Sequence, residues 1–185
     1  QSPGFWDGIP RELDSTYSIV GSFPTTRLLP VHPFWPSTLV IRRDYFDTLN
    51  GWNQNLKGIK SEDNEFSFRA IKNGRLGLIW SPTVRYRTHP GNDSSSSLLN
   101  ALGRTQIWEI LLLSQELTDS ERNGLNNAIN NALHETIFSA FFEKQYGVVL
   151  QVSKKISKYD LTIPEKIKIA LSKAIAGMSS IKKTN

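Results

Sequence analysis

The chain has 185 residues, of which 38% are hydrophobic, and this is enough to bury the core of one domain with a helical extension. It contains no cysteine, which excludes a disulfide scaffold, a cysteine nucleophile, a thiolate-ligated zinc and an iron–sulfur cluster. No apolar run approaches the roughly 20 residues that a membrane-spanning helix needs. The chain begins with Gln and shows no signal peptide, so we expect a fragment or a trimmed polypeptide.

The net charge of +5 belongs to the C-terminal part of the chain. Residues 1–141 carry 13 basic and 14 acidic side chains, whereas residues 142–185 carry nine Lys, no Arg and three acids. A basic tail suggests an anionic surface as its neighbour. Because base recognition and bidentate phosphate binding usually rely on Arg, we expect no nucleic-acid partner.

The first hundred residues predict a mixture of strands and helices. Residues 1–36, rich in Pro, Gly and aromatics, predict irregular structure with a short strand at 17–20. The β-branched run at 37–42, bounded by Pro36, predicts a buried strand. A short helix is expected over 43–49, ending at Asn50-Gly51.

The next segment contains the most strongly signalled short helix. Ser61 precedes three acids of a first turn, which predicts a helix to about residue 72, capped by the Ser61 side chain and ending at Asn73-Gly74. Two strand-like runs, 76–80 and 83–87, follow it. A polar loop then starts at His89 and is expected to be mobile.

From residue 99 onward the pattern is helical. A capping box at Thr118 and Glu121 begins a long helix, and a second box at Thr162 and Glu165 begins a Lys-bearing helix. One stripe of that last helix is apolar: Ile167, Ala170, Leu171, Ala174, Ile175 and Met178. Such a helix fits either an anionic bilayer surface or the protein's own core.

Few residues are candidates for chemistry. The three histidines, His32, His89 and His134, are widely separated, and no phosphate-binding glycine loop or nucleophile elbow is present. What remains is the acidic helix start at 61–65 and the polar segment 85–94. A carboxylate in a first turn faces free N–H groups that favour its ionised form, which suits a general base, although acids are also common there for stability alone.

Taken in order, four segments resemble the second half of the catalytic domain of family 2 glycosyltransferases, which have the GT-A fold. They are residues 36–46, residues 49–56, the helix opened by Glu62-Asp63, and residues 86–94. The resemblance implies an α/β fold: a partial, Rossmann-like GT-A half over 1–98, followed by an all-helical extension over 99–185. It also implies inverting transfer of a sugar from a nucleotide-diphosphate donor to an acceptor hydroxyl.

The resemblance further implies roles for individual residues. Asp63 is the expected base that deprotonates the acceptor, and Glu62 is expected to shape the acceptor site. Three further roles follow from it: Arg87 and Ser94 near the diphosphate, and His89 as a ligand of Mn²⁺ or Mg²⁺. Independently of the resemblance, the Trp52 ring could stack on a sugar or base, although large aromatics are more often core or interface residues.

The sequence departs from the family in one serious respect. The nucleotide-binding half with its Asp-x-Asp metal motif should precede these segments, and residues 1–32 contain no such motif. We therefore expect this chain to lack most of the donor site and to be inactive by itself. A smaller departure is Asn53, where the family often has an acid.

Two functions of different class follow from these observations. The first is a glycosyltransferase acting on a polysaccharide or lipid-linked glycan, cytoplasmic and in peripheral contact with the inner face of the membrane through the Lys-rich helix. The alternative is a non-catalytic module that binds carbohydrate or protein and carries a basic helical tail.

Overall fold

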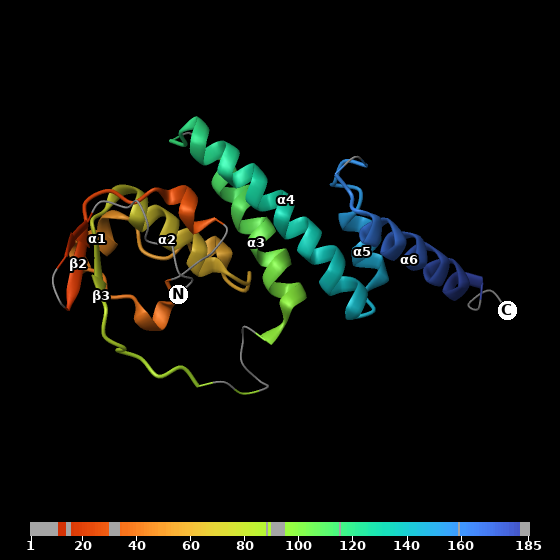
Figure 1. Cartoon of the computed structure of the whole chain (residues 1–185), viewed down its shortest axis with the longest axis horizontal. Coiled ribbons are helices and arrows are strands. Elements are labelled where there is room, and N and C mark those ends of the chain that lie inside the picture. The colour runs from red at the N-terminus through yellow and green to blue at the C-terminus, as the bar shows by residue number, and fades with distance from the viewer. Residues whose placement is uncertain are drawn as a thin grey trace.

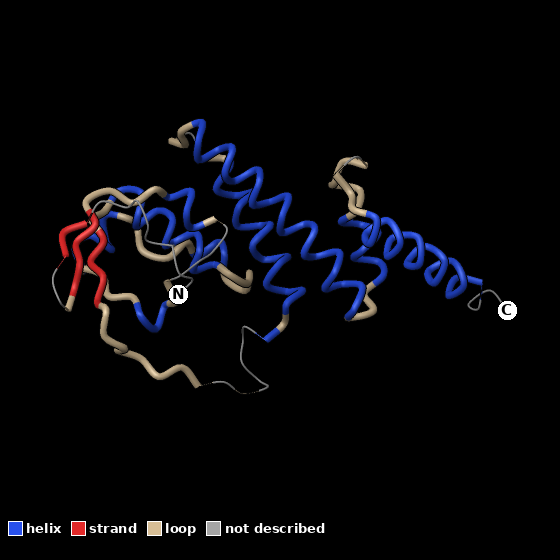
Figure 2. The backbone as a smooth tube through the Cα atoms, viewed as in Figure 1, coloured by secondary structure: helices blue, strands red, loops and turns tan. Residues whose placement is uncertain are grey.

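A small antiparallel sheet forms one end of the molecule (Figure 2). The computed structural model describes residues 11–13, 16–29, 34–87, 89, 95–114, 116–158 and 160–181. Within them, β1 (Arg11–Leu13) pairs with β2 (Tyr17–Val20), and β2 pairs with β3 (Leu76–Ile79), giving the order β1-β2-β3. The predictions of strands at 17–20 and 76–80 are confirmed, the second with one residue fewer.

Helices α1 (Arg43–Thr48) and α2 (Glu62–Asn73) have the predicted positions. The turn after α1 places Asn50 and Gly51 at φ of 57° and 62°, a conformation that Asn and Gly tolerate best. Ser61 also has a positive φ, 65°, and its side chain makes no capping hydrogen bond. Hydroxyl capping by Ser61 was therefore a wrong prediction, because a capping side chain normally requires an extended backbone at that residue.

The prediction of a buried strand over residues 37–42 is wrong. Pro36–Thr38 form a 3₁₀ turn, η2, and residues 39–42 follow with extended backbone but outside the sheet. Val40, in the middle of this β-branched run, is 95% exposed. A strand requires a neighbour for its backbone groups, and no described strand pairs with this segment. The strand expected over 83–87 is likewise absent.

Long helices form the rest of the molecule (Figure 1). Helices α3 (Ser97–Leu112) and α4 (Asp119–Phe142) lie side by side as an antiparallel pair, and α2 packs on α3. The capping box at the start of α4 is confirmed, since Thr118 and Glu121 exchange side-chain and backbone hydrogen bonds. After α4 come α5 (Tyr146–Val152), which was not predicted, and α6 (Ile163–Ile181).

The described chain is thus mostly helical with a small sheet, which is compatible with an α/β class. One hydrophobic cluster joins the parts before and after residue 98. It combines Leu56 and Phe68 with Ile107, Trp108 and Leu125. No helix in the described ranges is both long enough and apolar enough to cross a bilayer.

Buried Glu121 connects two elements, η1 (Thr25–Leu28) and α2, to the start of α4. Its carboxylate accepts hydrogen bonds from the Thr25 hydroxyl of η1 at 2.6 Å and from Lys72 Nζ of α2 at 2.6 Å. It also accepts from Thr118. Burial alone would raise the pKa of Glu121, but these hydrogen bonds outweigh burial and lower the pKa to about 2.

This lowered pKa predicts how stability depends on pH. The unfolded chain binds the Glu121 proton near its ordinary pKa of 4.5, whereas the folded chain binds it near 2. The contribution, about 3 kcal/mol, is therefore fully present above pH 4.5 and is lost as the pH falls toward 2. Urea unfolding between pH 7 and pH 2 should show this loss, and Glu121→Gln should remove it while lowering stability at pH 7. If Glu121→Gln keeps the wild-type acid sensitivity, the Glu121 network is not its source.

Candidate functional site

Asp63 lies in the first turn of α2, beside Glu62. Its side chain is half-buried, whereas Glu62 is exposed. Burial raises the pKa of Asp63, the negative charge of Glu62 raises it further, and the backbone N–H groups of Asp63 and Asn64 act in the opposite sense. A carboxylate with a raised pKa is a stronger base than an ordinary aspartate.

The turn that precedes Trp52 is fixed by hydrogen bonds from a side chain of α2. Arg69 donates to the carbonyl oxygens of Leu49 and Gly51, at 2.7 and 3.0 Å, and its guanidinium pairs with buried Glu65 at 2.6 Å. Gly51 approaches the Phe46 ring so closely that a Cβ would come within 2.9 Å of it. The turn that precedes Trp52 is therefore fixed to the same helix that carries Asp63.

The Trp52 ring packs on α2 and keeps one part open to solvent. It stacks on buried Phe66 with ring centroids 4.2 Å apart and a tilt of 31°, and it remains 36% exposed. Beside it is a hollow of about 260 Å³. The lining residues are Pro36, Trp52, Asn53, Gln54, Leu56, Lys57 and Glu62. The structure thus brings Trp52 and Glu62 to one hollow, with Asp63 at the next position of the helix.

The segment with Arg87 and His89 approaches this region from β3. Tyr86 stacks on Trp35 with ring centroids 5.0 Å apart, and Trp35 directly precedes Pro36 of the hollow. Arg87 and His89 are both exposed, and neither lines the hollow. Ser94 and His32 lie outside the described residues. The third histidine, His134, is not part of this region, because its Nδ1 lies 2.6 Å from Glu165 Oε1 at the α4–α6 contact.

The expected divalent-cation site is not assembled by the described residues alone. Within the described ranges, no three His, Cys, Asp or Glu side chains gather as ligands of one ion. The His89 side chain is exposed. These residues do not by themselves fit a bound Mn²⁺ or Mg²⁺, and we derive no chemical step through a metal.

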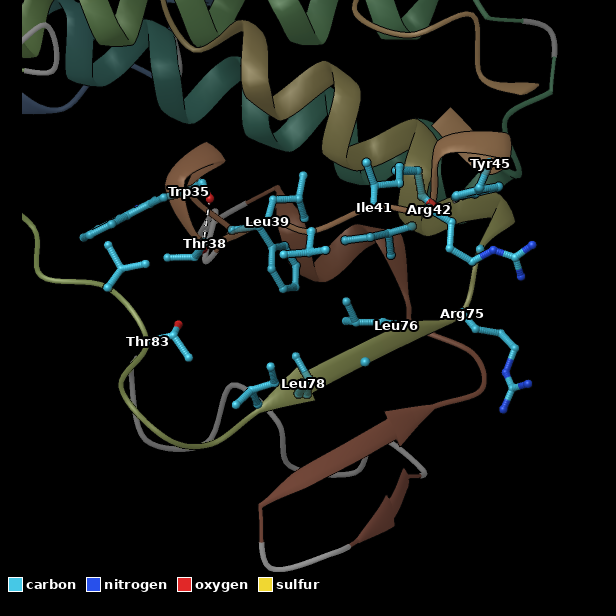
Figure 3. Close-up of a pocket in the computed structure, with 18 of the residues that line it drawn as sticks. Trp35, Thr38, Leu39, Ile41, Arg42, Tyr45, Arg75, Leu76, Leu78 and Thr83 are labelled. Carbon is cyan, nitrogen blue, oxygen red and sulfur yellow. Dashed lines mark hydrogen bonds between the residues drawn. The ribbon is translucent and has the colours of Figure 1, made fainter. Parts of the chain in front are cut away.

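A second, larger cavity of about 1370 Å³ is lined in part by Trp35, the residue before Pro36 of the hollow (Figure 3). One wall is the extended segment 39–42 with Trp35, and the other is β3 with the residues that follow it. All of β3 lines the cavity, and β2 pairs with its opposite edge, so the cavity follows the unpaired edge of β3. Leu39, Ile41, Leu76 and Leu78 give it a largely apolar lining (Figure 3).

Two kinds of residue in this region were missed from the sequence. Lys57 and Gln54 line the hollow from η3 (Gln54–Leu56) and the residue after it, and Asn53 caps η3 by accepting from Asn55 N at 3.1 Å. Arg69 was also missed as the residue that positions the Trp52 turn. Only Arg69 had a usable signal, its place four residues after Glu65 on one helix.

Comparison of the chain with family models, with curated proteins and with solved structures finds no match in any of the three.

Proposed function

We propose that this chain supplies the acceptor side of an inverting glycosyltransferase similar to family 2, with Asp63 as the general base. The observation that carries the proposal is the first turn of α2. There Asp63, a half-buried aspartate with a raised pKa, directly follows Glu62, which lines one hollow together with Trp52. A sugar ring can stack on an aromatic side chain such as Trp52 through its C–H groups, and its hydroxyls would then face Glu62 across the hollow.

The proposed reaction is a single displacement. The acceptor oxygen attacks C1 of the donor sugar, the bond from C1 to the diphosphate oxygen breaks, and the electron pair leaves with the nucleoside diphosphate. The hydroxyl proton passes to the Asp63 carboxylate, which must therefore be ionised at the start. Arg87 is proposed to offset negative charge on the leaving diphosphate, with Ser94 as a further contributor.

The donor half is proposed to come from residues outside those described. The large cavity has two walls that pair with no further described strand, segment 39–42 and the outer edge of β3. A run as apolar as Leu39–Ile41 gains most if another strand covers it. The exposed Val40 supports this placement of the donor half. The acceptor is proposed to be a polysaccharide or a lipid-linked glycan.

The same large cavity favours the second candidate function. With an apolar lining and the aromatic rings of Trp35, Tyr45 and Trp80 along it, it also suits a binding module that holds a carbohydrate or an extended peptide without chemistry. The two functions differ in what Asp63 does, because only the transferase requires an ionised carboxylate there.

Transfer by the intact natural gene product tests the proposal. The protein is incubated with radiolabelled nucleotide-diphosphate sugars and with glycan extracted from its source, and label in the glycan is measured. Label that depends on the enzyme supports a transferase. A folded gene product that binds glycan and transfers no sugar from any donor supports the binding module instead.

Trp52→Ala is expected to weaken acceptor binding by this enzyme. Loss of a stacking face should raise the acceptor KM about tenfold while the donor KM stays within about twofold. Trp52→Phe is the matched control. It keeps an aromatic ring on Phe66, so its acceptor KM should rise much less. An equal rise of the donor KM, or an unchanged acceptor KM, would contradict the placement of the acceptor at this hollow.

A further inference from the structure

Helix α6 packs on the molecule through a mixed face of polar and apolar side chains. Glu165 and Ser172 are buried together with Ile169, and Glu165 accepts hydrogen bonds from Thr162 and contacts His134 of α4. Lys168 extends over the Phe138 ring of α4, with Nζ 4.3 Å from the ring centroid. These contacts fix the rotation of α6 about its axis and so determine which side chains face outward.

The outward side of α6 is the apolar stripe of the sequence. Ile163, Ile167, Leu171 and Met178 are 73%, 55%, 48% and 60% exposed. Ala170 and Ala174 lie between them and are also exposed. At 1.5 Å per residue the stripe is about 22 Å long. Of the two sequence alternatives, docking on the protein's own core holds for the helix, which packs on α4 and α5 and buries Ile169. The stripe itself faces outward, and only its Ile175 is partly buried.

The shape of the molecule leaves this stripe accessible. Helix α6 contacts α4 and α5 and extends away from the sheet, so that its C-terminal end lies at the far end of the molecule (Figure 1). In the C-terminal part of the helix, from 170 to 178, only Ser172 is buried. An extended apolar row of this kind on a projecting helix calls for a covering surface.

The charges around the stripe identify that surface. Lys166 and Lys173 are exposed to one side of the stripe, since they lie about 105 and 125° from the centre of its four large side chains at 100° per residue. The one acid of α6, Glu165, is on the buried side, so the described outward surface of this helix carries positive charge only. Pairing with a second copy would bring these lysines near one another, and their like charges would repel. An anionic bilayer can bury the apolar stripe and attract the lysines at the same time.

We propose that α6 is a membrane-surface helix, with Ile163, Ile167, Leu171 and Met178 entering the acyl boundary of an anionic bilayer and Lys166 and Lys173 contacting its headgroups. The helix lies in the plane of the interface and does not cross it. None of these residues belongs to the α2 site, so the proposal stands or falls independently of glycosyl transfer.

Sedimentation with extruded vesicles tests this proposal on the 185-residue chain. The vesicles are pure phosphatidylcholine, or phosphatidylcholine with 30% phosphatidylglycerol. The chain should sediment with the anionic vesicles, should bind them more weakly as salt rises from 0.1 to 0.5 M, and should bind the neutral vesicles at least tenfold more weakly. Equal binding to both vesicle types, or to neither, overturns the proposal.

Two variants separate the apolar and charged contributions. Ile167→Gln with Leu171→Gln should lower the partition coefficient for anionic vesicles tenfold or more, and Lys166→Gln with Lys173→Gln should reduce its dependence on salt. The control is Leu113→Gln, which removes a leucine that is 82% exposed at the end of α3 and should bind as wild type does. All four replaced side chains of the two variants lie on the outside, so circular dichroism should stay unchanged.

The same variants detect the other possible occupant. If the Ile167→Gln, Leu171→Gln chain elutes as a monomer where the wild type elutes as a dimer, and wild type ignores the vesicles, a second copy covers the stripe and the membrane proposal is wrong.

Discussion

Asp63→Asn should lower glycosyl transfer by the intact gene product by a factor of about 10² to 10⁴, the usual loss when a positioned base is removed. The amide keeps the shape of the side chain but cannot accept the hydroxyl proton. Donor binding should stay nearly unchanged, because the proposed role of Asp63 is on the acceptor. Initial rates and nucleotide-sugar affinity, measured on the same preparations, separate the two effects.

The pH profile adds a readout that a purely structural aspartate would not give. Asp63 must be ionised to act, so kcat/KM should fall as the pH drops through its raised pKa, above the range of an ordinary aspartate. Glu62→Gln removes the neighbouring negative charge that helps to raise this pKa. The acid limb should therefore move to lower pH in Glu62→Gln. A silent Asp63→Asn variant would support the binding module.

Gly103→Ala should destabilise the chain by about 2 kcal/mol or more. Gly103 lies in α3 where the helix meets the backbone of Lys60. A Cβ there would overlap the Lys60 carbonyl oxygen and lie 2.7 Å from its carbonyl carbon. Alanine by itself favours a helix over glycine by about 1 kcal/mol, but a clash with backbone cannot be relieved by turning a side chain and outweighs that gain.

Gly147→Ala is the matched control for Gly103→Ala. Gly147 is also in a helix, α5, and a Cβ there meets nothing within 4 Å, so alanine should stabilise by about 0.5 to 1 kcal/mol. Urea unfolding of both variants gives the comparison. If the two variants had equal free energies of unfolding, α3 would not be in close contact with the Lys60 backbone. Since Lys60 lies two residues before Glu62, Gly103→Ala should also disturb the α2 site.

Local chemistry made several elements predictable. The capping box of α4, and the hydrogen bonds from Thr162 to the Glu165 carboxylate at the start of α6, join residues three apart in sequence and form wherever the helix begins. Helix α1 stops at Asn50 and Gly51, residue types that tolerate the positive φ found there. For α2, the acids at its start and Asn73-Gly74 at its end were enough to predict both ends of the helix, even though the Ser61 side chain does not cap it.

Tertiary contacts determined what the sequence pattern did not reveal. Residues 37–42 have strand chemistry but no described neighbour to pair with. The rotation of α6 depends on His134 and Phe138, which are distant in sequence, and they draw Glu165 and Lys168 inward. At the site, Trp52 and Glu62 line the same hollow, and Arg69 fixes the turn before Trp52 by hydrogen bonds to its carbonyl oxygens. Sequence spacing alone does not predict these hydrogen bonds.

The stereochemistry of the product tests the proposed function most directly. The intact gene product is supplied with a nucleotide-diphosphate sugar and glycan acceptor, and NMR follows the nucleoside diphosphate released and the anomeric configuration of the new bond. A single displacement with Asp63 as base predicts one glycosidic bond for each nucleoside diphosphate, with configuration opposite to that of the donor. Retained configuration, or a folded gene product that consumes no nucleotide sugar, would contradict it.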